Sequence, residues 1–254
     1  MSEQGDDEII VRSIVLAGQE NRGALQNSSE ERYEAEIQVA GRPMVDYVLD
    51  ALGGAEGIDD IVLVAPDSIR RPGTIGARVE GDIIANLLSG IQALPSLSGP
   101  VLVVTSDVPL LTSRMIDQFL NEAPLGVDVV YPIIEKGLTQ NKFPDTKRTY
   151  VKLRDGSFTG GNMFLINPVK FLEIQNEIKV LLDHRKSPIR LARDIGVMTL
   201  VRLILGNLSI RAAERRVGSL LNIQGRALIF PYPEVGVDVD KPQDLALVES
   251  VLSV

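Results

Sequence analysis

Aspartates stand at two points of the chain where a hydrophobic run ends, and these residue types could bind a metal ion. Asp107 directly follows the β-branched run 101–106 and precedes Pro109. A carboxylate at such a strand end can give one oxygen to Mg²⁺, while water and substrate phosphates complete the octahedral shell. An aspartate that forms a turn before a proline explains the same residues equally well. Asp107 is therefore a candidate metal ligand, with a turn residue as the alternative.

The second point is near the end of the sequence, where Asp238 and Asp240 are two residues apart. In an extended segment, residues at i and i+2 point to the same side. Asp240 and Gln243 have the spacing of a helix-capping pair, with Pro242 in the first turn of the following helix. We therefore interpret Asp240 as structural and Asp238 as the second candidate metal ligand.

A polar loop follows the first hydrophobic run, which ends at Leu16, Ala17 and Gly18. Glycine lets a backbone approach a ligand closely, and successive N–H groups in such a turn can hold phosphate oxygens. The loop has neither the dinucleotide-binding glycine motif nor the lysine of a P-loop. A nucleotide-binding turn and a plain structural turn both remain open here.

Positive charge is concentrated in two segments of an acidic chain, which has 26 basic and 34 acidic residues and a formal net charge of −8. Segment 136–154 has six basic residues and one aspartate. Clustered cationic donors neutralise charge during phosphoryl transfer, so we select Lys147 and Arg148 for this role, with a solvated loop as the alternative. Segment 185–216 has eight basic residues and two acidic ones on an amphipathic pattern. A core helix explains it most simply; an acceptor lid, a homodimer face or docking on an anionic lipid surface are alternatives.

Composition excludes several classes of protein. The acidic balance and 4% aromatic residues argue against a general nucleic-acid binder. The absence of cysteine excludes disulfides and thiolate metal sites, and His184, the single histidine, lies in a polar run typical of the surface. No stretch has the ~20 apolar residues of a membrane span, and the acidic start does not resemble a signal peptide. We therefore expect a cytoplasmic protein.

Short hydrophobic runs alternate with amphipathic segments along the chain, which predicts an α/β fold with a mostly parallel, mixed sheet flanked by helices. We expect one Rossmann-like domain over residues 1–254, with a helical insertion around 184–221. The predicted strands are 9–16, 60–65, 101–106, 127–132, 162–167 and 224–230. The predicted helices are 44–52, 83–94, 113–122, two helices within 189–221 broken near 206–207, and 242–252.

Four motifs, at 14–18, 40–45, 106–111 and 237–245, resemble in their order those of the MobA-like nucleotidyltransferases. The resemblance implies a nucleotide-diphospho-sugar transferase-like sheet, an NTP donor, Mg²⁺ and a small anionic acceptor, often phosphorylated, whose attack on the α-phosphate releases pyrophosphate. It does not identify the base or the acceptor.

The resemblance also implies residue roles. Asp107 and Asp238 match positions of metal-binding residues, and the backbone of Leu16, Ala17 and Gly18 matches the nucleotide loop. Gly81 and Asn86 lie where relatives recognise the base. The predicted acceptor-binding residues are Gly160, Gly161 and Asn162.

Two departures from the family pattern concern the nucleotide loop. Gln19 stands where relatives have a second glycine, and Glu34 falls near the phosphate-binding lysine. Segment 19–36 has five glutamates and two arginines, so it should repel a triphosphate. Arg22 or Arg32 replaces the lysine, or basic residues reach in from elsewhere, or the chain no longer transfers nucleotides. The alternatives to a nucleotidyltransferase are a non-catalytic nucleotide or metabolite sensor, and a glycosyltransferase of this fold that uses a nucleotide-sugar.

Overall fold

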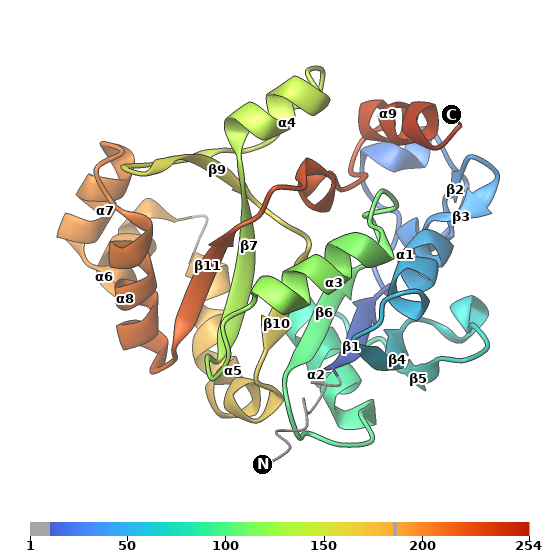
Figure 1. The fold of residues 1–254 in the computed structure, drawn as a ribbon, viewed down its shortest axis with the longest axis horizontal. Helices are drawn as coiled ribbons and strands as arrows, with labels where there is room; N and C mark the ends of the chain where they lie inside the picture. The colour runs from blue at the N-terminus through green and yellow to red at the C-terminus, as the bar shows by residue number, and fades with distance from the viewer. Residues whose placement is uncertain (1–10, 185–186, 254) are drawn as a thin grey trace, which may run out of the picture.

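A mixed β-sheet forms the centre of the protein (Figure 1). In its parallel half, β1 (Val11–Leu16) lies between β4 (Ile58–Val64) and β6 (Val101–Thr105), and β5 (Ile75–Ala77) is the outer strand beside β4. These strands are runs of Val, Ile and Leu, as expected where helices cover both faces of a sheet. The predicted α/β class is confirmed.

The other half of the sheet is mainly antiparallel. From β6 it continues through β10 (Met163–Ile166), β7 (Val129–Glu135), β9 (Gly156–Gly160) and β8 (Val151–Leu153). β11 (Gly225–Ile229) pairs with β7 in parallel. A small antiparallel pair, β2 (Gln38–Val39) with β3 (Arg42–Pro43), lies outside this sheet.

Helices cover both faces of the sheet, and the alternation of side chains along β1 shows why. Val15 packs in the core beneath α1 (Met44–Gly53) and α3 (Ser113–Glu122). Ile14 points to the opposite face, where the core lies beneath α2 (Ile83–Ala93) and α5 (Pro168–His184). Period-2 alternation in the strands thus supplies two apolar faces, each closed by amphipathic helices.

A third apolar cluster lies beside the carboxyl ends of the parallel strands. It joins Leu25 of the loop after β1 and Met44 of α1 to Val237, Val239 and Val248. Val248 belongs to α9 (Pro242–Leu252), the last helix. This cluster holds the segment before α9 against the edge of the sheet where the predicted site lies.

Four further helices lie in the second half of the chain. α4 (Lys136–Lys142) follows β7, while α6 (Pro188–Ile195), α7 (Val197–Ile204) and α8 (Ile210–Leu221) lie at the left end of the molecule in Figure 1. The predicted break near 206–207 is confirmed between α7 and α8. The predicted number of two helices is wrong, because Gly196 takes a φ of +89° and separates α6 from α7.

The structure describes residues 11–184 and 187–253, so Ile9 and Ile10 of the first predicted strand and the acidic start lie outside it. Within the described ranges, no helix is long and apolar enough to cross a bilayer. Helices α4 and α5, strand β5 and the β8–β9 hairpin were not predicted. Pro168 does end a strand, as expected, but it also occupies the first turn of α5.

Candidate functional site

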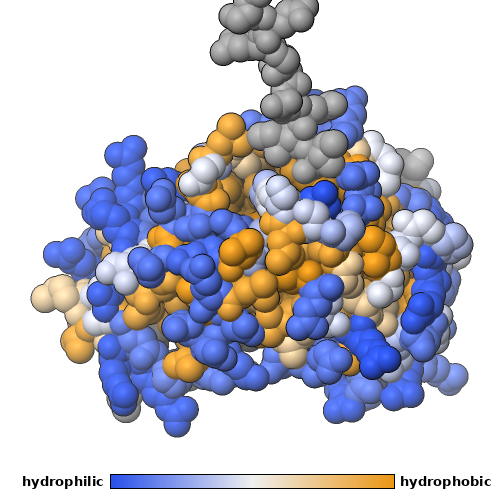
Figure 2. All heavy atoms as spheres, turned by 90° about the horizontal axis from the view of Figure 1, so that it is seen from below, coloured by the Kyte–Doolittle hydropathy of each residue, from blue (hydrophilic) through white to orange (hydrophobic). Residues whose placement is uncertain are grey.

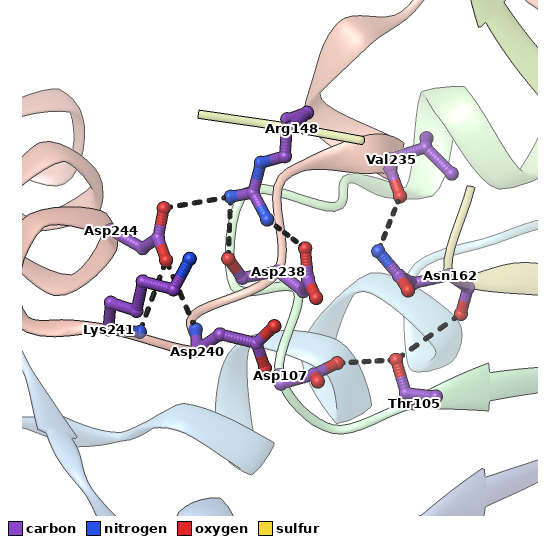
Figure 3. Close-up of polar contacts among 9 residues, drawn as sticks. All are labelled: Thr105, Asp107, Arg148, Asn162, Val235, Asp238, Asp240, Lys241 and Asp244. Atoms are coloured by element: carbon purple, nitrogen blue, oxygen red, sulfur yellow. Dashed lines mark hydrogen bonds and ion pairs between the residues drawn. The ribbon is translucent and has the colours of Figure 1, made fainter. Parts of the chain in front are cut away.

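Three aspartates from two distant segments meet beyond the carboxyl end of β6 (Figure 3). The backbone N–H of Val239 donates to the carbonyl oxygen of Asp107 at 2.9 Å and joins the segments. Val237 and Val239 are fully buried, so the alternating residues, Asp238 and Asp240, point to the other side. The structure thus brings Asp107 and Asp238 together, as the sequence predicted, and adds Asp240.

The carboxylates are close enough to share one cation. One oxygen from each of Asp107, Asp238 and Asp240 lies within 4.8 Å of the other two. Burial and the neighbouring negative charges raise the pKa of Asp238 to about 7, and burial is the main cause of the raised pKa of Asp107. Clustered carboxylates are stable as ions when a cation lies among them, and hard oxygen ligands of this kind suit Mg²⁺. The donor set therefore fits a divalent metal ion.

The interpretation of Asp240 as a helix cap is wrong. Lys241 is the N-cap residue of α9, and the carboxylate of Asp244 accepts the backbone N–H groups of Lys241 at 3.1 Å and Asp240 at 3.4 Å. The helix thus begins one residue later than the spacing of Asp240 and Gln243 suggested. Because Asp244 does the capping, the Asp240 side chain faces Asp107.

Arg148 connects the candidate metal ligand Asp238 to Asp244, which caps α9. Its guanidinium donates to the carboxylate of Asp238, to the carbonyl oxygen of Asp238 at 2.7 Å and to the carboxylate of Asp244 at 3.1 Å (Figure 3). The Arg148 side chain is only 7% exposed. The sequence analysis assigned it to substrate phosphate, but in the structure two of its nitrogens contact protein carboxylates. Lys147, its neighbour, is exposed.

Thr105 and Asn162 connect the metal-site edge to the predicted acceptor region. The Thr105 hydroxyl donates to the carboxylate of Asp107, and the Thr105 N–H donates to the carbonyl oxygen of Asn162 at 3.1 Å. The Asn162 side-chain amide donates to the carbonyl oxygen of Val235 at 3.3 Å. Asn162 is therefore linked to Asp107 through Thr105.

Tyr131 is a residue of this region that the sequence analysis missed. A Cβ atom at Gly160 would lie 2.0 Å from the Tyr131 hydroxyl oxygen, so only glycine admits the ring there. A Cβ atom at Gly161 would also be too close to its neighbours, since it would lie 2.9 Å from the side chains of Pro132 and Val235. Burial and the charge of Asp238 raise the pKa of Tyr131. Gly160 thus leaves room for the Tyr131 phenol near Asp238. No local pattern in the sequence predicts this placement of Tyr131.

The predicted nucleotide loop and base-recognition turn lie side by side. A Cβ at Gly18 would lie 2.6 Å from the side chain of Val79, which leads into the turn containing Gly81. Asn86 is buried and its side-chain oxygen accepts the N–H of Glu80 at 2.7 Å, so it holds that turn.

Sheet hydrogen bonds occupy the backbone just before Gly18. The carbonyl oxygen of Leu16 accepts the N–H of Ser106 at 3.1 Å, and the N–H of Ala17 donates to Val64 at 2.9 Å. The backbone groups of this loop that are available to a ligand therefore begin at Gly18.

The acidic loop after Gly18 is closed by Asn21, whose buried side chain donates to the carbonyl oxygens of Ser29 at 3.2 Å and Glu31 at 3.1 Å. Arg22 and Arg32 both pair with Glu20, and their side chains are exposed. Their charges are thus partly offset within the loop.

The charges of the three aspartates act on Glu34. Burial and the charges of Asp107, Asp240 and Asp238 raise the pKa of Glu34 to about 7. Its backbone N–H donates to the carbonyl oxygen of Gln19 at 3.0 Å, which fixes its place beside the nucleotide loop. The glutamate noted in the sequence as a departure is therefore subject to the negative charges of the candidate metal ligands.

Comparisons with known proteins show which family this chain belongs to. A family model described as the MobA-like NTP transferase domain matches residues 14–177. A probable molybdenum cofactor guanylyltransferase from Thermococcus gammatolerans is 32% identical over 87 residues, covering 34% of this chain and 45% of that protein. The match thus spans less than half of that relative's length.

Solved structures share the whole fold. A hypothetical transferase from Thermus thermophilus is 38% identical, with a TM-score of 0.83 over 92% of this chain and 99% of that chain. A 4-diphosphocytidyl-2C-methyl-D-erythritol synthase from Anaerococcus prevotii shares the fold at 12% identity, with a TM-score of 0.59 over 98% of this chain and 100% of that chain. Since the family model spans more than half of the chain, the protein belongs to the MobA-like NTP transferase family.

Proposed function

We propose that the protein transfers a nucleoside monophosphate from an NTP to a small anionic acceptor and releases pyrophosphate. The observation that carries the proposal is the cluster of Asp107, Asp238 and Asp240 beside the Gly18 loop, in a chain that belongs to a family of NTP transferases. We propose Mg²⁺ as the ion, because NTP sites hold it with one or two carboxylates and phosphate oxygens. Bound there, it would neutralise charge on the phosphates.

In the proposed reaction, an anionic phosphate oxygen of the acceptor forms a bond to the α-phosphorus. The bond from that phosphorus to the oxygen bridging to the β-phosphate breaks, and pyrophosphate leaves with the electron pair. An attacking oxygen that is already ionised needs no general base, so catalysis is positioning and charge stabilisation. The backbone at Gly18, which Leu16 and Ala17 anchor to the sheet, and the turn of Gly81 and Asn86 would position the nucleotide. Gly160, Gly161, Asn162 and Tyr131 would position the acceptor.

Phosphate neutralisation in this protein would differ from the family pattern. Glu34 gives no positive charge where relatives have lysine, so the bound metal ion and Lys147 would provide it. Arg148 would position Asp238 rather than contact substrate, since its donors already bind Asp238 and Asp244. Arg22 is a second candidate for phosphate contact, although Glu20 competes for its charge.

Pyrophosphate release tests the proposal. The purified protein is mixed with each of the four NTPs and a panel of phosphorylated acceptors, in MgCl₂ or in EDTA. We expect release with one NTP and one class of acceptor in MgCl₂, and none in EDTA or in Asp107→Asn. Nucleotide binding without release from any pair would favour the sensor instead. Turnover of a nucleotide-sugar would favour the glycosyltransferase.

A further inference from the structure

Helix α7 is apolar over most of its circumference, yet none of its residues is fully buried. Of its eight residues, only Thr199 and Arg202 are polar. Its outward side chains are strongly exposed: Val197 68%, Met198 66%, Val201 42%, Ile204 73% and the adjoining Leu205 63%. We call these five residues the α7 apolar face. A cluster of exposed apolar side chains on one helix marks an interaction site, so this face points to a partner.

The helices around α7 are held in place by polar contacts on their inner side. Arg216 of α8 donates to the carbonyl oxygen of Asp194 at 2.9 Å, and His184 pairs with the Asp194 carboxylate at 2.6 Å. His184, predicted as a surface residue, is only 25% exposed for this reason. The Asp155 carboxylate accepts the N–H of Ile210 and fixes the start of α8. The α7 apolar face is therefore presented by an anchored unit.

Basic side chains surround this face. Between 190 and 226 there are seven arginines and two acidic residues, in a chain whose net charge is −8. The stem of Lys152, on β8, packs against Gly206 at the end of α7. We call six exposed residues on α7 and its neighbouring elements the basic rim: Lys152, Arg154, Arg193, Arg202, Arg211 and Arg215. Among the residues that the structure describes, none of the six forms an ion pair with an acidic side chain.

We propose that the α7 apolar face and the basic rim dock the protein on an anionic lipid surface. The apolar side chains would enter the interface between headgroups and acyl chains, and the basic rim would contact lipid phosphates, as on interfacial amphipathic helices. Figure 1 places α7 at an outer corner of the molecule. Figure 2 views the molecule from below, away from α7, and shows apolar side chains among hydrophilic ones in the middle of that face. The protruding α7 apolar face suits a flat surface.

A second copy of the chain fits this surface less well. A two-fold interface centred on α7 would place the basic rim of one copy opposite the same rim of the other. Like charges at such an interface repel, whereas an anionic lipid surface complements them. This inference does not rest on nucleotide transfer, and its test needs no turnover.

A tryptophan probe makes the test direct, because the chain has no tryptophan of its own. Ile204→Trp places one fluorophore in the α7 apolar face, and Leu125→Trp, at a position 76% exposed in the α3–β7 connection, is the matched control. We expect vesicles of phosphatidylcholine with 30% phosphatidylglycerol to shift the emission of Ile204→Trp to the blue. Pure phosphatidylcholine vesicles should have little effect, and Leu125→Trp should not respond to either.

Sedimentation with the same vesicles measures binding of the protein without a probe. We expect Arg202→Glu with Arg211→Glu, and separately Ile204→Asp with Leu205→Asp, to reduce binding at least tenfold. Arg70→Glu, an exposed arginine on the far side of the sheet, should bind like wild type. Circular dichroism shows whether each variant is folded.

Equal sedimentation of folded α7 variants and wild type, or no binding of wild type to anionic vesicles, would overturn the proposal. A dimer in light scattering that Ile204→Asp dissociates, without vesicle binding, would assign the face to a second copy instead. Pyrophosphate release from a water-soluble acceptor should be unchanged in all α7 variants, so the two proposals fail separately.

Discussion

The Val239 N–H donates to the Asp107 carbonyl oxygen at 2.9 Å, and this one hydrogen bond joins the end of β6 to the segment before α9. It places Asp238 and Asp240, on either side of Val239, against the Asp107 carboxylate. Backbone pairing therefore joins the two segments of the site. Because side chains alternate along the second segment, Asp238 and Asp240 both point toward Asp107.

Asp107→Asn tests the metal site without changing its shape. The amide oxygen can still accept the Thr105 hydroxyl, but one negative charge is lost. We expect kcat/KM for nucleotidyl transfer to fall by about 10²-fold or more, because a bound metal provides several kcal/mol of charge stabilisation. The thermal midpoint without metal should not fall. Steady-state kinetics and melting in EDTA measure the two effects, and a variant with wild-type turnover in Mg²⁺ would remove Asp107 from the site.

Replacing Asp244 should lower stability, whereas replacing Asp240 should weaken ligand binding. Asp244→Ala removes the cap of α9 and a partner of the buried Arg148, so the free energy of unfolding should drop by about 1–3 kcal/mol. Asp240→Ala removes only an exposed carboxylate of the cluster, and it should weaken Mg²⁺-dependent NTP binding at nearly unchanged stability. Urea unfolding and calorimetric titration provide the measurements. The reverse pattern would restore Asp240 as the capping residue.

Glu34 should make the metal-free protein less stable as pH rises. Its pKa goes from 4.5, its ordinary value, to about 7 in the folded state, so the folded protein binds the extra proton between these values. Stability from this group is therefore present at low pH and is lost as pH rises through about 7.

Glu34→Gln isolates this effect from the other carboxyl groups. In EDTA, we expect the variant to melt at a higher temperature than wild type at pH 8, with a smaller difference at pH 5. Mg²⁺ should reduce the difference at pH 8, because the cation compensates the same charges. A difference in melting temperature that is the same at both pH values would show that the three aspartates do not raise the pKa of Glu34.

Glu34→Lys introduces a positive charge near the position where the family resemblance places a phosphate-binding lysine. We expect NTP affinity without divalent metal to rise at least about tenfold, since a repulsive charge becomes attractive near the phosphates. Glu34→Gln should lie between the variant and wild type. Fluorescent-nucleotide titration in EDTA gives the affinities, and an unchanged value for Glu34→Lys would place the phosphates away from residue 34.

Lys147 and Arg148 are neighbours that should respond differently. Arg148→Ala leaves Asp238 and Asp244 unpaired in a buried position, so it should destabilise the fold by about 3–5 kcal/mol. Lys147→Ala removes an exposed charge and should lower turnover with little change in stability. Arg22→Ala and Arg32→Ala should lower turnover less than Lys147→Ala does. If activity survives Lys147→Ala but not Arg22→Ala, the phosphate contact belongs to the loop after Gly18.

Much of the fold follows from the sequence because hydrophobic periodicity is local. The strands ending at Leu16 and Thr105 and the helix beginning at Ile83 lie where the pattern predicts them. Helix α5 and the β8–β9 hairpin escaped prediction, since their side chains are only half-buried and the apolar pattern is weak.

For the site, the residue types and their spacing were enough to select Asp107, at the end of a strand, and Asp238, in the segment before the last helix, as carboxylates that meet at one edge of an α/β sheet. The three-dimensional arrangement adds that Asp240 joins them, that Arg148 binds Asp238 and that the charges of all three aspartates act on Glu34. These outcomes depend on contacts between segments far apart in the chain, and no local pattern encodes them. The exposure of α7 could not be predicted from the sequence either. Periodicity shows that a helix face is apolar, but the packing of the other elements decides whether that face is covered.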